Sequence, residues 1–214
     1  MFCMRRCRLC GVVVLFLLLC SSLAVAHVPY FEHYNFSEQT PFLVRKMVTQ
    51  SKAIYAWLEH DGINPCVDID VYKIPVRRPL SMYVELLVPV VDEYYADFVP
   101  WFALAGPGLP DPGYDLPFHI PPGYGAIVNE NVEPGEQRET FYEPFGGKSY
   151  YKGPVYEEFL NDVGIYYVYV WDPYESGGDY TLVLGSLEIW GPLDILRALI
   201  YTPLIRRGLE LHII

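Results

Sequence analysis

Residues 79–90, PLSMYVELLVPV, alternate between apolar and polar side chains, and this pattern limits the fold more than any other feature of the chain. Side chains two positions apart lie on the same face of an extended strand. The apolar set on one face comprises Leu80, Met82, Val84, Leu86 and Val88. The opposite face carries Ser, Tyr and Glu side chains. The segment is therefore predicted to form a half-buried β-strand.

Five other segments are rich in β-branched and aromatic residues and end at residues that favour turns. These expected strands are residues 53–60, 66–76, 99–108, 164–173 and 179–190. Nineteen prolines and 17 glycines oppose long helices and favour frequent turns. We therefore expect residues 27–190 to form an all-β fold, a single jelly-roll-like β-sandwich of about seven to nine strands.

The expected strands 164–173 and 179–190 are joined by the sequence YESGGD. A Gly-Gly pair at a chain reversal is typical of a tight turn, so we expect these two strands to pair as a β-hairpin. Residues 164–173 carry apolar or aromatic side chains on both faces. This strand is expected at the centre of a sheet, with one face against the other sheet and the other face covered by another segment.

A long segment, residues 107–147, is dense in Pro, Gly and aromatic residues and shows little periodicity. Irregular segments of this length are uncommon inside a compact domain unless they carry function. We expect this segment to form an irregular cover packed over one sheet. Residues 155–162, VYEEFLND, are expected to form one or two helical turns.

The C-terminal segment, residues 191–214, contains a predicted short amphipathic helix that begins at Pro192 and ends near Pro203. Four apolar side chains share one face of this helix: Leu193, Leu196, Leu199 and Ile200. The helix is too short and too charged to span a bilayer. It either packs on the sandwich or lies at a membrane surface through residues 192–207, with two arginines near the lipid headgroups.

Residues 1–26 have the three parts of a secretory signal peptide, which is expected to be helical. Three arginines precede the apolar run GVVVLFLLLC, and the small residues Ala24 and Ala26 mark a cleavage site. Cleavage after Ala26 would release a secreted or cell-surface protein that begins with His27. A retained leader would instead anchor the chain in a membrane. Four of the five cysteines lie in the leader, so Cys66 has no partner for an internal disulfide in the mature chain.

The chain carries 15 basic and 26 acidic residues, a formal net charge of −11. Removal of the leader takes away three arginines and no acidic residue, so 12 basic residues would face 26 acidic ones. Nucleic-acid binding requires clustered Lys and Arg that neutralise phosphates. The charge therefore excludes nucleic acid as a partner and suits an extracellular domain or a weak cation binder.

The segment DIDVYKIPVRRPLSMYVEL and the later segment GIYYVYVWDPYESGGDYTLVLG resemble the signature of bacterial pre-peptidase C-terminal domains. The matching positions are Asp68, Asp70, Tyr72, Gly164, Tyr166, Gly178, Asp179, Tyr180 and Leu182. The resemblance implies a secreted jelly-roll β-sandwich with a non-catalytic role. The chain is also similar to a group of uncharacterised exported β-sandwich proteins with segments such as SKAIYAWLE and GGDYTLVLG. In that group a membrane helix tends to follow the sandwich.

A chain that begins with His27 would offer its α-amino group and its imidazole to one metal ion. A second imidazole would complete a three-nitrogen set suited to copper, and His33 and His119 are the candidates. This arrangement resembles that of lytic polysaccharide monooxygenases and implies a copper-dependent oxidase. The alternative is that His27 comes first only because the leader ends there, and that His33 is a hydrogen-bonded loop residue.

Asp68 and Asp70 alternate on one face of an expected strand, where both carboxylates could bind Ca²⁺ together with loop carbonyls. The alternative is that both are solvated acids at a sheet edge. Asn35 begins the sequence Asn-Phe-Ser, which is an acceptor pattern for N-glycosylation in organisms that have this pathway.

These observations favour a non-catalytic secreted or cell-surface module that binds a protein or glycan partner and needs no cofactor. Two other functions stay open. One is a copper-dependent oxidase that uses His27, and the other is a membrane-associated accessory subunit docked by residues 192–207. The three hypotheses place function in different parts of the chain: the sandwich surface, the N-terminus and the C-terminal helix.

Overall fold

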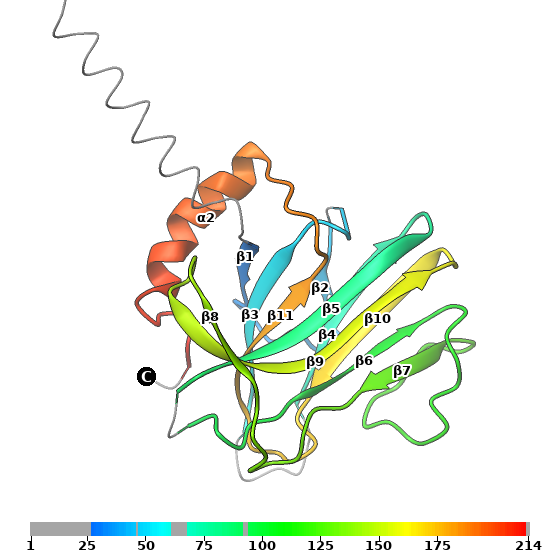
Figure 1. Ribbon diagram of the computed structural model, residues 1–214. Helices are drawn as coiled ribbons and strands as arrows, with labels where there is room; N and C mark the ends of the chain where they lie inside the picture. The colour runs from blue at the N-terminus through cyan, green and yellow to red at the C-terminus, as the bar shows by residue number, and fades with distance from the viewer. Residues whose placement is uncertain (1–26, 46, 61–67, 92–93, 213–214) are drawn as a thin grey trace, which may run out of the picture.

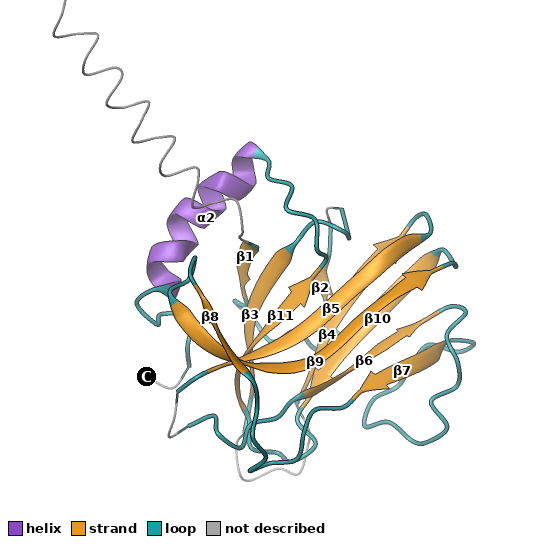
Figure 2. Cartoon of the chain, in the orientation of Figure 1, coloured by secondary structure: helices purple, strands orange, loops and turns teal. Residues whose placement is uncertain are grey.

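The computed structural model describes residues 27–45, 47–60, 68–91 and 94–212 (Figure 1). The signal peptide and Cys66 lie outside these ranges. The described residues form two β-sheets packed face to face, with one helix at the edge of the sandwich (Figure 2). The predicted all-β sandwich is therefore confirmed.

One sheet has six strands and the other has five. In spatial order the six-stranded sheet contains β1 (Val28–Phe31), β3 (Lys52–Leu58), β11 (Gly178–Leu184), β5 (Leu80–Pro89), β9 (Lys148–Leu160) and β8 (Thr140–Glu143). The five-stranded sheet contains β2 (Phe42–Leu43), β4 (Ile69–Val76), β10 (Gly164–Trp171), β6 (Trp101–Gly106) and β7 (Gly125–Asn129). From β3 to β6, and again from β9 to β11, each strand lies in the opposite sheet from the one before it.

The length of the chain suggested about seven to nine strands. The described residues contain more than that. The additional strands are mainly short ones at or near the sheet edges, such as β1, β2, β7 and β8. Segments of two to five residues are too brief to show a period of two in the sequence.

The main core lies between the sheets and is built from alternate residues of the central strands. The side chains of β5 in this core are Met82, Val84, Leu86 and Val88, as the alternation predicts, whereas Leu87 is buried on the opposite face with Tyr150 and Val183. Tyr72 and Tyr166 enter this core from the five-stranded sheet, and Tyr180 enters it from the six-stranded sheet. The Tyr72 and Tyr180 hydroxyls lie 2.7 Å apart and share a hydrogen bond, so the two sheets are joined by a polar contact inside an apolar core.

A second core covers the outer face of the five-stranded sheet, as predicted for the strand 164–173. Tyr169 and Trp171 of β10 are buried there, beneath the Pro-rich segment. The ring of Phe118 from that segment stacks on Tyr169, with 4.1 Å between ring centroids and 5° between planes. The cover is less irregular than expected, because β7 and β8 form within residues 107–147.

The prediction of a hairpin between β10 and β11 is wrong, because these strands lie in different sheets. β10 already pairs with β4 on one side and β6 on the other, so no edge is left for β11. The connecting turn is held by Asp172, whose Oδ2 accepts hydrogen bonds from the backbone N–H groups of Ser176 at 2.7 Å and Gly177 at 3.0 Å. The turn therefore carries the chain across the sandwich edge.

The helical turns predicted for residues 155–162 are also absent, since most of this segment belongs to the long strand β9. β9 pairs with β5 along almost its whole length, from Tyr150 opposite Pro89 to Leu160 opposite Leu80. Tyr156 and Leu160 are the buried residues of the segment, and residues four apart share a face in a strand as well as in a helix. The spacing alone therefore does not distinguish the two structures.

The C-terminal helix α2 (Pro192–Ile205) begins at the predicted residue and continues two residues past Pro203. A proline this close to the end removes one hydrogen bond from the last turns and does not stop the helix. Gly191 precedes the helix, and its N–H donates to the Asp194 carboxylate at 3.0 Å. The helix packs along β1 at one edge of the sandwich (Figure 2).

Candidate functional site

The two charged residues of α2 lie against the sandwich, one of them buried and the other partly exposed. Asp194 and Arg197 are the charged residues between Pro192 and Ile205. Asp194 is 1% exposed, and the Gln50 side-chain amide donates to its carboxylate at 3.0 Å. The Arg197 guanidinium lies over the ring of Tyr30, 4.2 Å from its centroid, and 3.5 Å from Asp194 Oδ1. Both charges therefore hold the helix to the domain.

Aromatic contacts complete the attachment of α2 to β1. The ring of Tyr201 stacks on Phe31 with 4.4 Å between centroids and 14° between planes. The Tyr201 hydroxyl also lies 3.3 Å from Nε2 of His33, within hydrogen-bond distance. Ala198 and Ile205 are buried on the same side of the helix. The helix therefore packs on the sandwich. The contacts are made by its polar and aromatic side chains and by the buried Ala198 and Ile205.

The opposite side of α2 is apolar and exposed. We call the four side chains that the sequence places together the α2 apolar face: Leu193 (68% exposed), Leu196 (54%), Leu199 (65%) and Ile200 (53%). A surface helix of a globular protein normally turns its apolar stripe inward and its charges outward. α2 has the reverse arrangement, because these apolar side chains face solvent.

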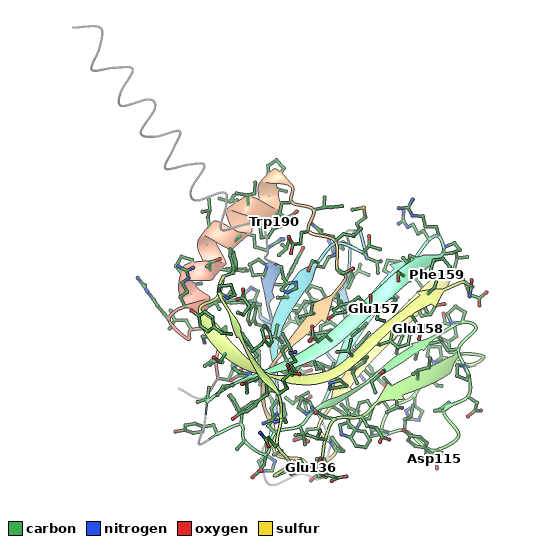
Figure 3. All side chains as sticks on the ribbon, in the orientation of Figure 1. Asp115, Glu136, Glu157, Glu158, Phe159 and Trp190 are labelled. Atoms are coloured by element: carbon green, nitrogen blue, oxygen red, sulfur yellow. The ribbon has the colours of Figure 1, made fainter. Side chains whose placement is uncertain are left out.

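Residues on both sides of α2 extend this surface. Leu187 and Ile189, just before the helix, are 49% and 48% exposed, and Trp190 follows them. Arg206 and Arg207 are exposed at the other end of the helix. Figure 3 shows Trp190 beside α2, whereas the acidic residues it labels lie away from the helix: Asp115, Glu136, Glu157 and Glu158. The apolar face is thus flanked by an aromatic residue and by cations.

A separate polar groove of about 810 Å³ lies between residues 34–40, the start of β4 and residues 117–119. It brings together three residues that the sequence singled out for different reasons, namely Asn35, Asp68 and His119. Asn35 Nδ2 donates to Asp68 Oδ1 at 3.2 Å, and the backbone N–H of Glu59 donates to Asp68 Oδ2 at 2.7 Å. The Asn35 side chain, the candidate glycosylation acceptor, therefore faces the groove.

The three candidate copper ligands make contacts in separate places. His27 Nδ1 hydrogen-bonds the Ser51 hydroxyl, and burial lowers the pKa of this imidazole. His33 lies beyond the other end of β1 against Tyr201, and His119 lines the polar groove. Within the described ranges, no group of three or more His, Cys, Asp or Glu side chains is arranged to hold a metal ion.

Asp70 is not a solvated edge residue, because it is 0% exposed on the inner face of β4. Tyr180 donates to its carboxyl at 2.5 Å. Burial raises the pKa of Asp70 to about 8, and burial beside Asp70 raises the pKa of Glu32 to about 9. Glu32 accepts hydrogen bonds from the backbone of Phe36 at 3.0 Å and Trp57 at 3.2 Å. Because Asp70 is enclosed in the core, Asp68 alone of the aspartate pair lines the groove.

The contacts that hold the C-terminal tail were not predicted from the sequence. His212 Nδ1 lies 2.7 Å from Asp179 Oδ1, and its ring stacks on Trp57 with 3.7 Å between centroids. Lys148 and Glu210 form a second ion pair. Trp57 and Asp179 are opposite each other on β3 and β11. Contacts between residues so far apart in the chain leave no local pattern that would reveal them.

No helix in the described part of the chain has the length and hydropathy needed to cross a membrane. No protein-family model matches the chain, and no curated protein matches it. The functional argument therefore rests on the two surfaces described above, the α2 apolar face and the polar groove.

Proposed function

We propose that this protein is a non-catalytic extracellular binding module that docks on a membrane surface through the α2 apolar face. One observation carries the proposal. The helix directs Asp194 and Arg197 to the sandwich and leaves the α2 apolar face exposed. A helix that only capped the sandwich would have the opposite arrangement.

The shape and the flanking residues favour lipid over a protein groove as the partner. The helix lies at the rim of the molecule (Figure 2), and the four side chains of its apolar face are exposed. Trp190 before the helix and Arg206 and Arg207 after it are residue types that favour the headgroup region. The acidic body of the protein would remain in water.

The connection to the leader also supports a membrane location. β1 begins at Val28, two residues after the predicted leader ends. α2 runs along β1 in the same direction, since Arg197 contacts Tyr30 and Tyr201 contacts Phe31. A retained leader would therefore hold α2 close to the bilayer, and a cleaved one would leave α2 as a reversible contact.

The expected affinity is modest. Each side chain of the α2 apolar face is a little more than half exposed, so its transfer into lipid would stabilise the docked state by ~1 kcal/mol. Four such contributions correspond to weak, reversible binding, which flanking arginines strengthen on anionic lipid.

Vesicle sedimentation of residues 27–214 tests the proposal. Leu199→Asn should lower the partition coefficient on anionic vesicles about fivefold. The matched control is Leu43→Asn in β2, where a leucine is 41% exposed away from α2, and it should leave partition unchanged. Equal partition of both variants and the parent would refute membrane docking. A dimer in solution that Leu199→Asn dissociates, without vesicle binding, would assign the face to a second copy of the chain.

A further inference from the structure

We infer that the polar groove is a binding site for an uncharged oligosaccharide. This goes beyond membrane docking, because the groove and the α2 apolar face share no residue. The groove has a volume of about 810 Å³ and is open to solvent along most of its extent. Its walls come from three segments that are distant in sequence. The groove is therefore formed by the folded domain and not by a single loop.

The polar groups of the groove are held in place before any ligand arrives. Asp68 is fixed by Asn35 and by the backbone N–H of Glu59. A carboxylate has about four acceptor positions, so Asp68 keeps acceptors for ligand hydroxyls. The Ser37 and Thr40 hydroxyls lie 3.0 Å apart, and Thr40 also donates to the Asn35 carbonyl at 2.9 Å. Fixed donors and acceptors reduce the entropy lost on binding.

Tyr34 supplies an aromatic surface at the same groove. Its side chain is 55% exposed. The ring meets Phe36 edge to face, with 5.3 Å between centroids and 84° between planes, and Phe36 is buried in the main core. Contact with this buried ring therefore restricts the orientation of the Tyr34 side chain. An aromatic ring beside fixed polar groups suits a sugar, which has apolar C–H faces and a rim of hydroxyls.

The charge of the groove selects against anionic ligands. Glu38 and Asp68 are its acidic residues, and none of the described residues that line it is Lys or Arg. The backbone N–H of His119 donates to Glu38 at 3.3 Å. The imidazole of His119 is the one basic side chain among the described residues that line the groove. Phosphorylated and uronic-acid sugars would meet like charge, so the structure favours a neutral chain.

Titration with defined oligosaccharides tests the inference. Residues 27–214 are produced in a host that does not glycosylate Asn35 and titrated with cellohexaose, maltohexaose and a linear mannan hexamer, with oligogalacturonate as the anionic probe. At least one neutral hexamer should bind, and oligogalacturonate should not. Tyr34→Ala should weaken binding about tenfold and Asp68→Asn about fivefold. Tyr142→Ala, at an exposed tyrosine on β8, is the control and should leave affinity unchanged.

Three results would overturn the inference. They are no binding of any neutral hexamer at millimolar concentration, binding that Tyr34→Ala leaves intact, and Ca²⁺ binding that Asp68→Asn abolishes while sugars have no effect. Vesicle partition of Tyr34→Ala should equal that of the parent chain. A failure of the saccharide site is thereby distinguished from a failure of membrane docking.

Discussion

Gln50 donates a hydrogen bond from Nε2 to the Oδ2 atom of Asp194 at 3.0 Å, and both side chains are buried. This contact joins the segment before β3 to the first turn of α2. The same carboxylate oxygen accepts the N–H of Gly191 at 3.0 Å. The rotation of α2 about its axis is thus set by a polar contact on its inner side, and the apolar side faces outward as a consequence.

Removal of this contact should destabilise the fold. Asp194→Ala removes an acceptor of the Gln50 amide, which keeps its bond to the Ile189 carbonyl at 2.6 Å, and removes the carboxylate that accepts the Gly191 N–H. We expect the free energy of unfolding, measured by urea titration, to fall by about 1–3 kcal/mol. Glu188→Ala, at an exposed acid just before α2, should change it by less than about 0.5 kcal/mol. An equal effect of the two substitutions would show that Asp194 does not hold the helix.

The cover over the five-stranded sheet should contribute to stability through Phe118. This ring is 7% exposed and stacks on Tyr169. Phe118→Ala should lower the free energy of unfolding by about 3 kcal/mol and shift tryptophan emission to longer wavelength, because Trp171 lies beneath the same ring. Tyr114→Ala, at a 53% exposed position of the cover, should leave both unchanged. No loss of stability in Phe118→Ala would mean that the cover is not part of the folded unit.

The buried acids predict how stability changes with pH. Asp70 and Glu32 titrate near their ordinary values of 3.8 and 4.5 in the unfolded chain and near 8 and 9 in the folded one. Between these values the folded protein keeps protons that the unfolded chain has lost. The free energy of unfolding should therefore fall as pH rises from about 4 to about 8.

A neutral side chain at Asp70 should reduce this pH dependence. Asp70→Asn can still accept the Tyr180 hydroxyl proton but has no charge to bury. We expect this variant to lose less stability than the parent between about pH 5 and about pH 8. Asp115→Asn, at an exposed acid, is the control and should follow the parent curve. A pH profile of Asp70→Asn that matches the parent would place the proton-linked groups elsewhere.

Strands whose two faces differ in polarity were predicted correctly from the sequence. The prediction failed where one sequence pattern is compatible with two structures. β5 was predicted as a strand from the alternation of Met82, Val84, Leu86 and Val88, but the burial of Leu87 on its other face was not predicted. Both faces of β10 are apolar, which correctly indicated a covered central strand. The pairing of β10 with β11 was wrong, because a Gly-Gly turn records a reversal of the chain and not the sheet to which the next strand belongs.

The candidate sites were predictable only in part. The shared face of Leu193, Leu196, Leu199 and Ile200 follows from helical spacing, but its direction depends on Gln50, which is more than 140 residues away. Asp68 and Asp70 were expected on one face of a strand, but Asp68 lies just before β4 and lines the groove, whereas Asp70 is enclosed beside Tyr180. Burial of that kind is a property of the assembled sheets.

Fluorescence from a dye on α2 tests the central claim most directly. Cys66 is the sole cysteine of residues 27–214, so Cys66→Ser allows a polarity-sensitive dye to be placed at Leu199→Cys or, as the control, at Glu158→Cys on β9. On addition of anionic vesicles, the dye at position 199 should shift to shorter wavelength and the dye at position 158 should not, because α2 enters the lipid interface and β9 stays in water. Emission that is unchanged at position 199, or that shifts equally at both positions, would contradict docking through the α2 apolar face.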